Sequence, residues 1–227
     1  MLTAKEIIKK IKSLSSSKNR EGMERFGIYI ATAYGTSVPA LRKIAKQIGK
    51  NHNLAIELWH TKIHEAQILA SMIAEPEKLT EKQMDEWIKD FNSWDVCDQV
   101  CMNLFDKTAI AYKKAGEWSA RYDEFEKRAG FALMAALATH DKNAPDKNFI
   151  KFLPIITRKS GDDRNFVKKS VNWALRQIGK RNLTLNKLAI KTAEEIQKID
   201  SKTAKWMATD ALHELTSSAV QDRLQTK

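Results

Sequence analysis

The sequence predicts an all-α protein in which successive helix pairs form an α-α superhelix, or solenoid. Apolar residues recur at helical spacing along almost the whole chain, beginning with Ile7, Ile8 and Ile11 and ending in a segment that contains Trp206 and Met207. Only 8 Gly and 4 Pro occur in 227 residues. Because an all-β fold needs many more turns, long helices with short connections explain this composition better.

Turn-forming residues set the expected helix boundaries. These fall at residues 15–17, around Gly35, at 49–53, at 75–76, near Gly116, at 143–145, at 161–163 and at 180–182. No linker is long or polar enough to divide the chain, so we expect a single domain over residues 1–227. The hexapeptide at residues 41–46, LRKIAK, is echoed at 175–180, LRQIGK. This echo favours a solenoid, whose concave face can grip a polymer, over a closed bundle.

Positive charge is concentrated in two parts of the chain. The formal net charge is +11. Residues 1–51 carry 11 Lys/Arg and 3 Asp/Glu, residues 52–146 carry 11 and 17, residues 147–191 carry 12 and 2, and residues 192–227 carry 5 and 6. Two basic segments therefore flank an acidic middle. Nucleic acid is the first partner that such an asymmetry indicates, an anionic membrane is the second, and a merely solubilising surface explains the charge equally well.

Several classes of function lack their sequence signals. The amino terminus has no apolar signal core, and the longest apolar run, residues 129–138, is too short to span a bilayer, so we expect a cytoplasmic protein without membrane association. Cys97 and Cys101 are one helical turn apart and fit a buried apolar face. The five histidines lack ligand spacing, and no phosphate-binding glycine loop occurs. We therefore expect no metal, no nucleotide cofactor and no other cofactor.

One helix displays a tryptophan among cations. Between residues 162 and 180, Val167, Val171, Ala174, Leu175 and Ile178 form one apolar stripe. The opposite side carries an aromatic and three cations, namely Lys169, Trp173, Arg176 and Lys180. Cations bind phosphates, and an aromatic ring offers a flat surface to a sugar or base. The competing interpretation is that Trp173 packs against a neighbouring helix or under the lysine and arginine stems.

A second unusual segment, NSWDVCD at residues 92–98, opens a helix capped by Asn92 or Ser93. Trp94 and Asp98 are four residues apart and lie together at the margin of its apolar face. An indole beside a carboxylate is a candidate site. The residues alone favour an ordinary interpretation, in which Asp95 complements the helix dipole, Trp94 anchors the core edge and Asp98 pairs with a basic residue.

Arg128 is the third unusual residue, because it begins the very apolar helix expected at 129–138. Its guanidinium must reach a carboxylate, a phosphate or solvent. A structural ion pair is the ordinary interpretation here too.

The Trp173 helix, the segment at 92–98 and the region of Arg128 together resemble the HEAT-like repeat DNA glycosylases of the AlkD type, the DNA alkylation repair family. The resemblance covers most of the chain, through GTSVPALR at 35–42, SWDVCD at 93–98, KRAGF at 127–131 and VKKSVNWALR at 167–176. It implies HEAT-like repeats with a basic concave face, and a monomer acting on duplex DNA that contains alkylated purines.

The resemblance also implies roles for individual residues. Trp94 and Trp173 match the family's tryptophans facing the lesion-bearing backbone, Asp98 matches its catalytic carboxylate, and Arg128 and Arg176 match its cleft arginines. The DNA-binding residues expected on this basis are Arg42, Lys168, Lys169, Arg176 and Lys180. The family's amino-terminal lesion contacts do not map cleanly: Phe26, Tyr29 or Tyr34 are the aromatic candidates, and Ser37 stands where a longer amide is expected.

Three hypotheses follow for the function. The first is a glycosylase that hydrolyses the N-glycosidic bond of cationic N3- or N7-alkylpurines without flipping the base, with Asp98 stabilising the oxocarbenium-like sugar or positioning water. The second is a noncatalytic protein that binds DNA or structured nucleic acid. The third is a protein-interaction solenoid with negligible affinity for nucleic acid. The two tryptophans and the acid favour the first over the second, because phosphate binding alone does not need them.

Overall fold

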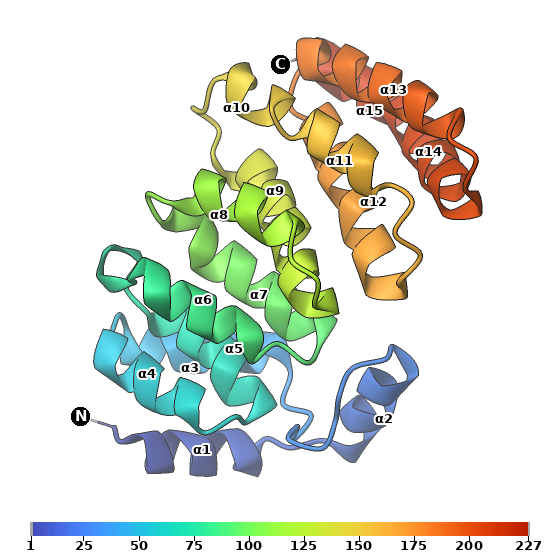
Figure 1. Cartoon of the computed structure of the whole chain (residues 1–227). Coiled ribbons are helices and arrows are strands. Elements are labelled where there is room, and N and C mark those ends of the chain that lie inside the picture. Colours follow the sequence, from blue (N-terminus) through green and yellow to red (C-terminus); the bar gives the residue numbers. More distant parts are fainter. Residues whose placement is uncertain (1, 227) are drawn as a thin grey trace. The chain divides into compact units, whose positions relative to one another are not determined.

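The computed structural model describes residues 2–226, and all regular structure in that range is helical (Figure 1). The prediction of an all-α protein is confirmed. The chain divides into two compact units, one ending at Ala109 and the other beginning at Ile110. That residues 1–227 act as one domain stays a prediction. No helix within residues 2–226 combines the length and the apolar character that crossing a membrane requires.

The first unit is built around one almost completely buried helix, α5. Its α-helices are α1 (Ala4–Ser13), α2 (Ser17–Arg25), α3 (Val38–Ile48), α4 (His52–His60), α5 (His64–Ile73), α6 (Glu81–Lys89) and α7 (Trp94–Asn103), with short 3₁₀ turns η1 (Pro76–Lys78) and η2 (Phe105–Lys107). Helices α3, α4 and α7 all pack against α5. Its apolar side chains are therefore surrounded on several faces, which explains why Ile68 and Leu69 are inaccessible to solvent.

Two tryptophans stack in the core of the first unit. The rings of Trp59 and Trp87 lie 3.9 Å apart with an interplanar angle of 3°. Trp59 Nε1 donates a hydrogen bond to Asp90 Oδ2 at 2.7 Å, so its polar atom is satisfied at the edge of the core. Together with the buried Trp118 of the second unit, these account for three of the six tryptophans. The other three, Trp94, Trp173 and Trp206, keep exposed surface.

A buried carboxylate fixes the loop between α2 and α3. Glu65, at the start of α5, accepts hydrogen bonds from the backbone amides of Tyr34 (2.9 Å), Gly35 (2.6 Å) and Thr36 (3.1 Å). Gly35 has a φ of 81° and a backbone so close to Ser16 that a Cβ would lie 2.3 Å from the Ser16 carbonyl oxygen. Both constraints require glycine there. The loop therefore holds α2 in a defined position relative to α5.

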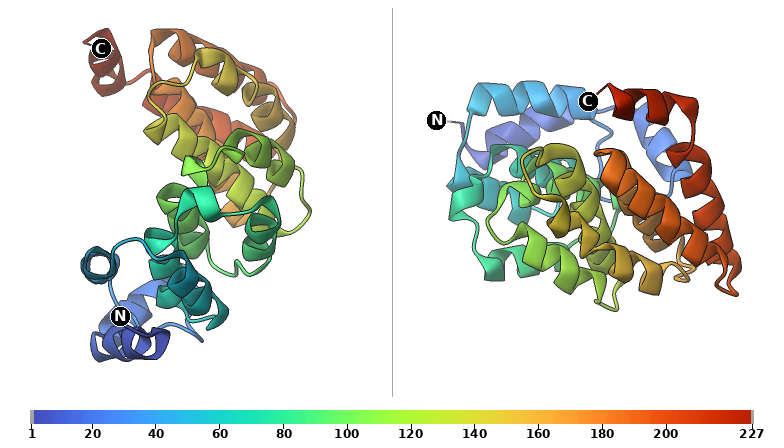
Figure 2. Two further views of the ribbon diagram at one scale, coloured as in Figure 1. Left: turned by 90° about the vertical axis from the view of Figure 1, so that its left-hand side faces the viewer. Right: turned by 90° about the horizontal axis from the view of Figure 1, so that it is seen from above.

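The second unit surrounds α9, which is buried over most of its length. Its helices are α8 (Ala111–Ser119), α9 (Glu124–His140), α10 (Asp146–Ile150), α11 (Leu153–Lys159), α12 (Asn165–Gly179), α13 (Leu183–Gln197), α14 (Lys202–Leu215) and α15 (Ser218–Gln225). Helices α8 and α12 pack on α9, and α13 and α14 form the next pair along the chain (Figure 2). At Gly130 an added Cβ would lie 2.3 Å from Ser119 N, so the absence of a side chain lets α8 and α9 approach.

Three details differ from the sequence-based expectations. Helix α8 runs through Gly116, and the chain turns at residues 120–123 instead, because Asp123 caps α9 through its side chain. Helix α9 therefore starts at Glu124, so Arg128 lies one turn inside it rather than at its beginning. Trp206, which belongs to the last segment of the apolar pattern, is 43 % exposed.

Helix α7 has the apolar face that its sequence predicts. Val96, Cys97, Val100, Cys101 and the following Leu104 are all buried. The two cysteines form no disulfide, and burial raises the pKa of Cys101 well above its ordinary value. Trp94 and Asp98 lie at the half-buried margin of this face.

Candidate nucleic-acid interface

The predicted apolar stripe of α12 is buried, and its opposite side carries the predicted cations. Val167, Val171, Ala174, Leu175 and Ile178 are all inaccessible to solvent. Lys169 is exposed, and Trp173, Arg176 and Lys180 are half-buried. The helix therefore presents these four residues away from its own core face, as the helical spacing predicts.

Some of these cations meet acids from α14. Arg176 Nη1 lies 3.4 Å from Asp210 Oδ2 and also pairs with Glu214, and Lys180 Nζ pairs with the other oxygen of Glu214. One turn earlier, Asn172 Nδ2 donates to Asp210 Oδ2 at 2.6 Å. Burial alone would raise the pKa of Glu214, but the hydrogen bond from Lys180 and the nearby Arg176 lower it, so this carboxylate is ionised at neutral pH.

We call this arrangement the α12–α14 ladder. It consists of Lys168, Asn172 and Arg176 on α12 and Lys180 directly after it, at steps of four residues, facing Trp206, Asp210 and Glu214 on α14. At its first step Lys168 Nζ lies 5.5 Å from the centre of the Trp206 ring. Helical spacing predicted two of these residues, Arg176 and Lys180, on one face of α12, but it indicated no partner for them. The partners are 34 to 38 residues further along the chain.

Trp173 and Lys169 lie beside the ladder without belonging to it. With the Gln177 amide oriented so that its oxygen faces the indole, Gln177 accepts a hydrogen bond from Trp173 Nε1 at 3.1 Å. This intrahelical contact holds the ring along α12. Lys169, one turn before Trp173, is exposed to solvent. Lys169 is thus the most accessible residue of the predicted face.

Arg128 is buried and reaches a backbone carbonyl. Only 6 % of the residue is exposed, and its Nη1 donates to the Phe166 carbonyl oxygen at 2.6 Å. That carbonyl belongs to the first turn of α12, so the guanidinium ties α9 to α12. The hydrogen bond fixes Arg128 in place.

In the α7 motif, Asp95 is engaged in structural contacts. Its Oδ1 accepts from Ser93 Oγ at 2.8 Å, and its Oδ2 lies 2.8 Å from Nε2 of the buried His64. Ser93 makes no side-chain hydrogen bond to the first amides of α7. The Asp95 carboxylate thus links the start of α7 to α5. Of the two acids in the motif, Asp98 is the one for which the family resemblance implies a role in chemistry.

Trp94 connects α7 to the end of α2. Its Nε1 donates to the Phe26 carbonyl oxygen at 3.0 Å, across 68 residues of sequence. Phe26, whose carbonyl accepts this hydrogen bond, is 72 % exposed, and Tyr29, three residues later, is 50 % exposed. Large exposed aromatics of this kind are available to a ligand. The structure thereby places the amino-terminal aromatic candidates on the segment that Trp94 holds.

A pocket of about 390 Å³ opens beside this segment. It is lined by parts of α2, the α2–α3 loop, α3, α5 and α7, including Lys18, Arg25, Ser37, His64 and Asp95. Two cations on α2 and the His64–Asp95 pair thus line the same cavity. Ser37, where the family pattern expects a longer amide, lines this pocket with its short side chain.

Several other cations neutralise helix C-termini. Lys50 Nζ donates to the carbonyl oxygens of Met72 (3.1 Å) and Ala74 (2.7 Å) at the end of α5, and burial lowers its pKa. Lys107 Nζ donates to the Asn103 carbonyl at the end of α7, and Arg181 Nη1 donates to the Ala138 carbonyl near the end of α9. Such cations complement the helix dipole. Arg42, by contrast, is exposed and borders a shallow hollow near Lys46.

The predicted site residues fall into two sets. Trp94, Asp98 and Arg42 belong to the first unit, and Arg128, Lys168, Lys169, Trp173, Arg176 and Lys180 belong to the second. Within the second unit, Arg128 lies on α9, which packs against α12, the helix that carries most of the other predicted residues. Convergence of both sets on one cleft stays a prediction. Within residues 2–226, no three His, Cys, Asp or Glu side chains group as metal ligands would.

Comparison with known proteins identifies the family. Residues 7–215 match the family model described as DNA alkylation repair enzyme. The chain belongs to this DNA alkylation repair enzyme family. The suspected resemblance is thereby confirmed, and the match extends over both units. Among curated proteins, no match is found.

A solved structure confirms the HEAT-like repeat fold of this family member. It is described as "a new family of proteins related to the HEAT-like repeat DNA glycosylases with affinity for branched DNA structures". The two chains superpose with a TM-score of 0.79 at 20 % sequence identity, over 98 % of this chain and 96 % of the other. At 20 % sequence identity, this similarity establishes the fold and not a shared function.

Proposed function

We propose that the protein is a DNA glycosylase that hydrolyses the N-glycosidic bond of cationic N3- or N7-alkylated purines in duplex DNA. The observation that carries this proposal is the grouping at the start of α7. Trp94 and Asp98 are half-buried at the edge of the core, and the indole is tied to the segment that exposes Phe26 and Tyr29. Membership of the DNA alkylation repair enzyme family supports the substrate class.

The chemistry follows from the charge of the substrate. An alkylated purine with a positive ring is already a good leaving group, and cleavage of its glycosidic bond develops positive charge on the deoxyribose. A carboxylate such as Asp98 stabilises that charge or orients the attacking water, and the face of an indole adds a cation–π interaction. No flipped base or deep base pocket is required. Five cations are assigned to phosphate contacts with DNA: Arg42, Lys168, Lys169, Arg176 and Lys180. Trp173 is assigned to the DNA backbone, and Arg128 holds the first turn of α12.

The test is single-turnover release of N7-methylguanine or N3-methyladenine from duplex DNA. We expect the Asp98→Asn variant to lose about 100-fold or more in rate while it still binds DNA, since the lost charge acts mainly in the transition state. Glu57→Gln, which removes an exposed carboxylate from α4, is the matched control and should leave the rate unchanged. If the unaltered protein releases no more base than buffer does, the glycosylase assignment is wrong.

Binding of structured DNA without turnover is the second candidate function. It is favoured by the α12–α14 ladder, where Arg176 and Lys180 are held by acids, and by the branched-DNA affinity attributed to the structural neighbour. This candidate predicts tighter binding to a three-way or four-way junction than to linear duplex of equal length, with no base release from either. Equal affinity for the two DNA forms would count against it.

A further inference from the structure

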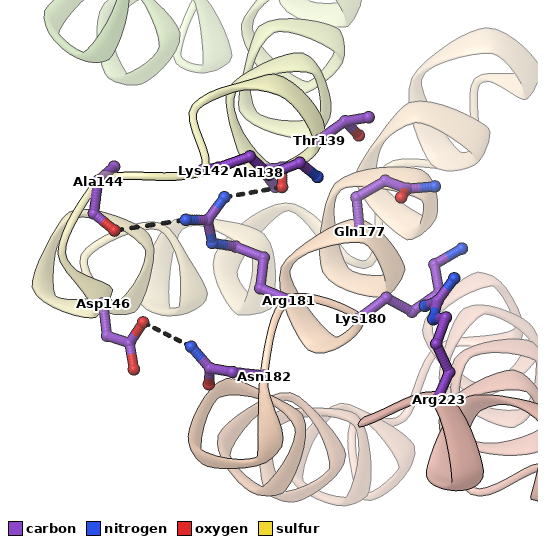
Figure 3. A pocket seen from close by; sticks show the side chains of 10 residues that line it. All are labelled: Ala138, Thr139, Lys142, Ala144, Asp146, Gln177, Lys180, Arg181, Asn182 and Arg223. Carbon is purple, nitrogen blue, oxygen red and sulfur yellow. Dashed lines mark hydrogen bonds between the residues drawn. The ribbon is translucent and has the colours of Figure 1, made fainter. Parts of the chain in front are cut away.

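A second cavity, in the second unit and separate from the residues proposed for chemistry, has a strongly basic lining. Its volume is about 400 Å³, and it is formed where α9 and α12 end and α13 begins (Figure 3). The lining includes four cations, Lys142, Lys180, Arg181 and Arg223, and one acid, Asp146. A net positive cavity of this size can hold a phosphate group together with part of the molecule that carries it.

Two of these cations have structural partners. Arg181 donates to the carbonyl oxygens of Ala138 (2.8 Å) and Ala144 (3.3 Å), and its guanidinium lies 3.9 Å from the centre of the Phe149 ring. Lys180 pairs with Glu214 in the α12–α14 ladder. Arg181 therefore forms a fixed wall of the pocket, and Lys180 contributes a charge that Glu214 partly offsets.

The other two cations give the pocket its unbalanced charge. Lys142 and Arg223 are exposed, and among residues 2–226 neither has a carboxylate within 4.0 Å. Lys180, directly after α12, and Arg223, on α15, both line the pocket (Figure 3). Like charges that line one pocket repel, and a bound anion relieves the repulsion.

The single acid lies at the other end of the pocket. Asp146 Oδ1 accepts a hydrogen bond from Asn182 Nδ2 at 2.8 Å, and Figure 3 places this pair on the opposite side of Arg181 from Lys180 and Arg223. The pocket thus has a cationic end and an end with a carboxylate and an amide. An anion at the cationic end is separated from the carboxylate by the Arg181 side chain.

Helix dipoles act on the pocket in both directions. The C-termini of α9 and α12 carry partial negative charge, which disfavours an anion. Arg181 offsets the carbonyls of α9, and α13, which begins after its N-cap Asn182, contributes the positive end of its dipole. The formal charges of Lys142 and Arg223 then decide the sign of the local potential.

We propose that this pocket is a phosphate-binding site, in which Lys142, Lys180 and Arg223 hold a phosphate group of a DNA strand. The nature of the molecule that carries the phosphate rests on the proposed DNA-binding function. The phosphate chemistry itself rests on the pocket alone. Three cations from the α9–α10 connection, α12 and α15 would close around the anion, while Gln177 lines the same end as a neutral hydrogen-bonding group.

Inorganic phosphate is the first probe, titrated into the full-length protein at constant ionic strength and followed by calorimetry or by amide NMR shifts of residues 177–182. The test variant is Lys142→Gln with Arg223→Gln. The matched control is Lys187→Gln with Lys191→Gln, which removes the same charge from exposed positions on α13. We expect the test variant to lose at least tenfold in phosphate affinity and the control to stay within twofold of the unaltered protein.

The second probe distinguishes a strand end from an internal backbone phosphate. Oligonucleotide duplexes with a 5′-phosphate, a 3′-phosphate or only hydroxyl ends are compared with both double variants. If the pocket holds a strand end, the test variant loses affinity only for the duplex with the matching terminal phosphate. If it holds an internal phosphate, the test variant loses the same affinity for all three duplexes. In that case its slope of log affinity against log salt also falls by about one.

The proposal is overturned if both double variants bind phosphate and DNA equally, or if phosphate binds the unaltered protein no better than chloride does. Base release by the unaltered protein is measured separately. Failure of the glycosylase assignment is therefore visible independently of the phosphate result.

Discussion

Asp162 illustrates how a single side chain outside any helix positions the elements around it. Its carboxylate accepts hydrogen bonds from Lys127 on α9 (3.1 Å) and from Arg164 at the start of α12 (2.6 Å). Burial alone would raise its pKa, but these two cations outweigh that effect and lower the pKa to about 2. The sequence indicated only a helix break at this position, because Lys127 is 35 residues away.

We predict that Asp162→Asn lowers the free energy of unfolding by about 3 kcal/mol at pH 7, since it leaves the largely buried Lys127 ammonium without its carboxylate. The folded pKa lies below the unfolded value of about 3.9, so the contribution is present above pH 4 and is lost as the pH falls towards 2. Urea unfolding of the unaltered protein and of Asp162→Asn from pH 7 down to pH 2 should show the difference in their unfolding free energies shrinking by about 2 kcal/mol. Asp163→Asn, at the exposed neighbour, is the control, and an equal effect of both variants would contradict the ion-pair explanation.

Individual side-chain roles were the least predictable feature. Helical spacing placed Trp173 and its neighbouring cations on one face correctly, because that geometry depends only on residues a few positions apart. The Trp94 bond to Phe26 and the Arg128 bond to Phe166 span 68 and 38 residues. Such contacts depend on which helices become neighbours, so the sequence alone could not assign them.

At the scale of the element, the α8–α9 contact depends on one missing side chain. A Cβ at Gly130 would lie 2.3 Å from Ser119 N, a backbone atom that cannot move independently of α8, whereas a Cβ at Gly116 would meet nothing within 4 Å. We predict that Gly130→Ala destabilises the protein by about 3 kcal/mol and that Gly116→Ala stabilises it by about 0.5 kcal/mol through helix propensity. Denaturant midpoints measure both. Equal midpoints for the two variants would show that the helices can separate at little cost.

The α12–α14 ladder gives a second prediction at this scale. Glu214→Gln removes the carboxylate that holds Arg176 and Lys180, so both cations become more available to phosphate. We predict that DNA affinity rises about threefold or more, while stability falls by about 1 kcal/mol. Fluorescence anisotropy with a labelled duplex and a melting curve measure the two effects.

The control for the ladder is Glu194→Gln, which removes the same charge from an exposed position on α13. If both variants raise the affinity equally, only the net charge has changed, and Arg176 and Lys180 do not contact DNA.

For the whole molecule, the fold class followed from the sequence because helical periodicity and scarce turn residues act locally along the entire chain. The boundary at Gly116 was wrong because a single glycine is compatible with an exposed helix, and Asp123 determines the next start. Net charge was a poorer guide to the interface. Lys50, Lys107 and Arg181 neutralise helix ends, so they contribute to the +11 without forming part of the predicted binding face.

One cooperative unfolding transition is expected for the whole chain, although it forms two compact units. In repeat folds each repeat is stabilised by its neighbours, so short arrays unfold together. Differential scanning calorimetry should give a calorimetric enthalpy equal to the van't Hoff enthalpy. Two resolved transitions would contradict the single-domain prediction for residues 1–227.

The placement of the two cysteines affects how the protein tolerates the agents that damage DNA. Alkylating electrophiles react with thiolates, and a thiol that is buried and protonated is a poor target. Cys97 and Cys101 are inaccessible to solvent, and the pKa of Cys101 is raised. They are the only cysteines in the sequence, and they share α7 with Trp94 and Asp98. The helix proposed to act on alkylation damage thus keeps its own nucleophiles out of reach of the same chemicals.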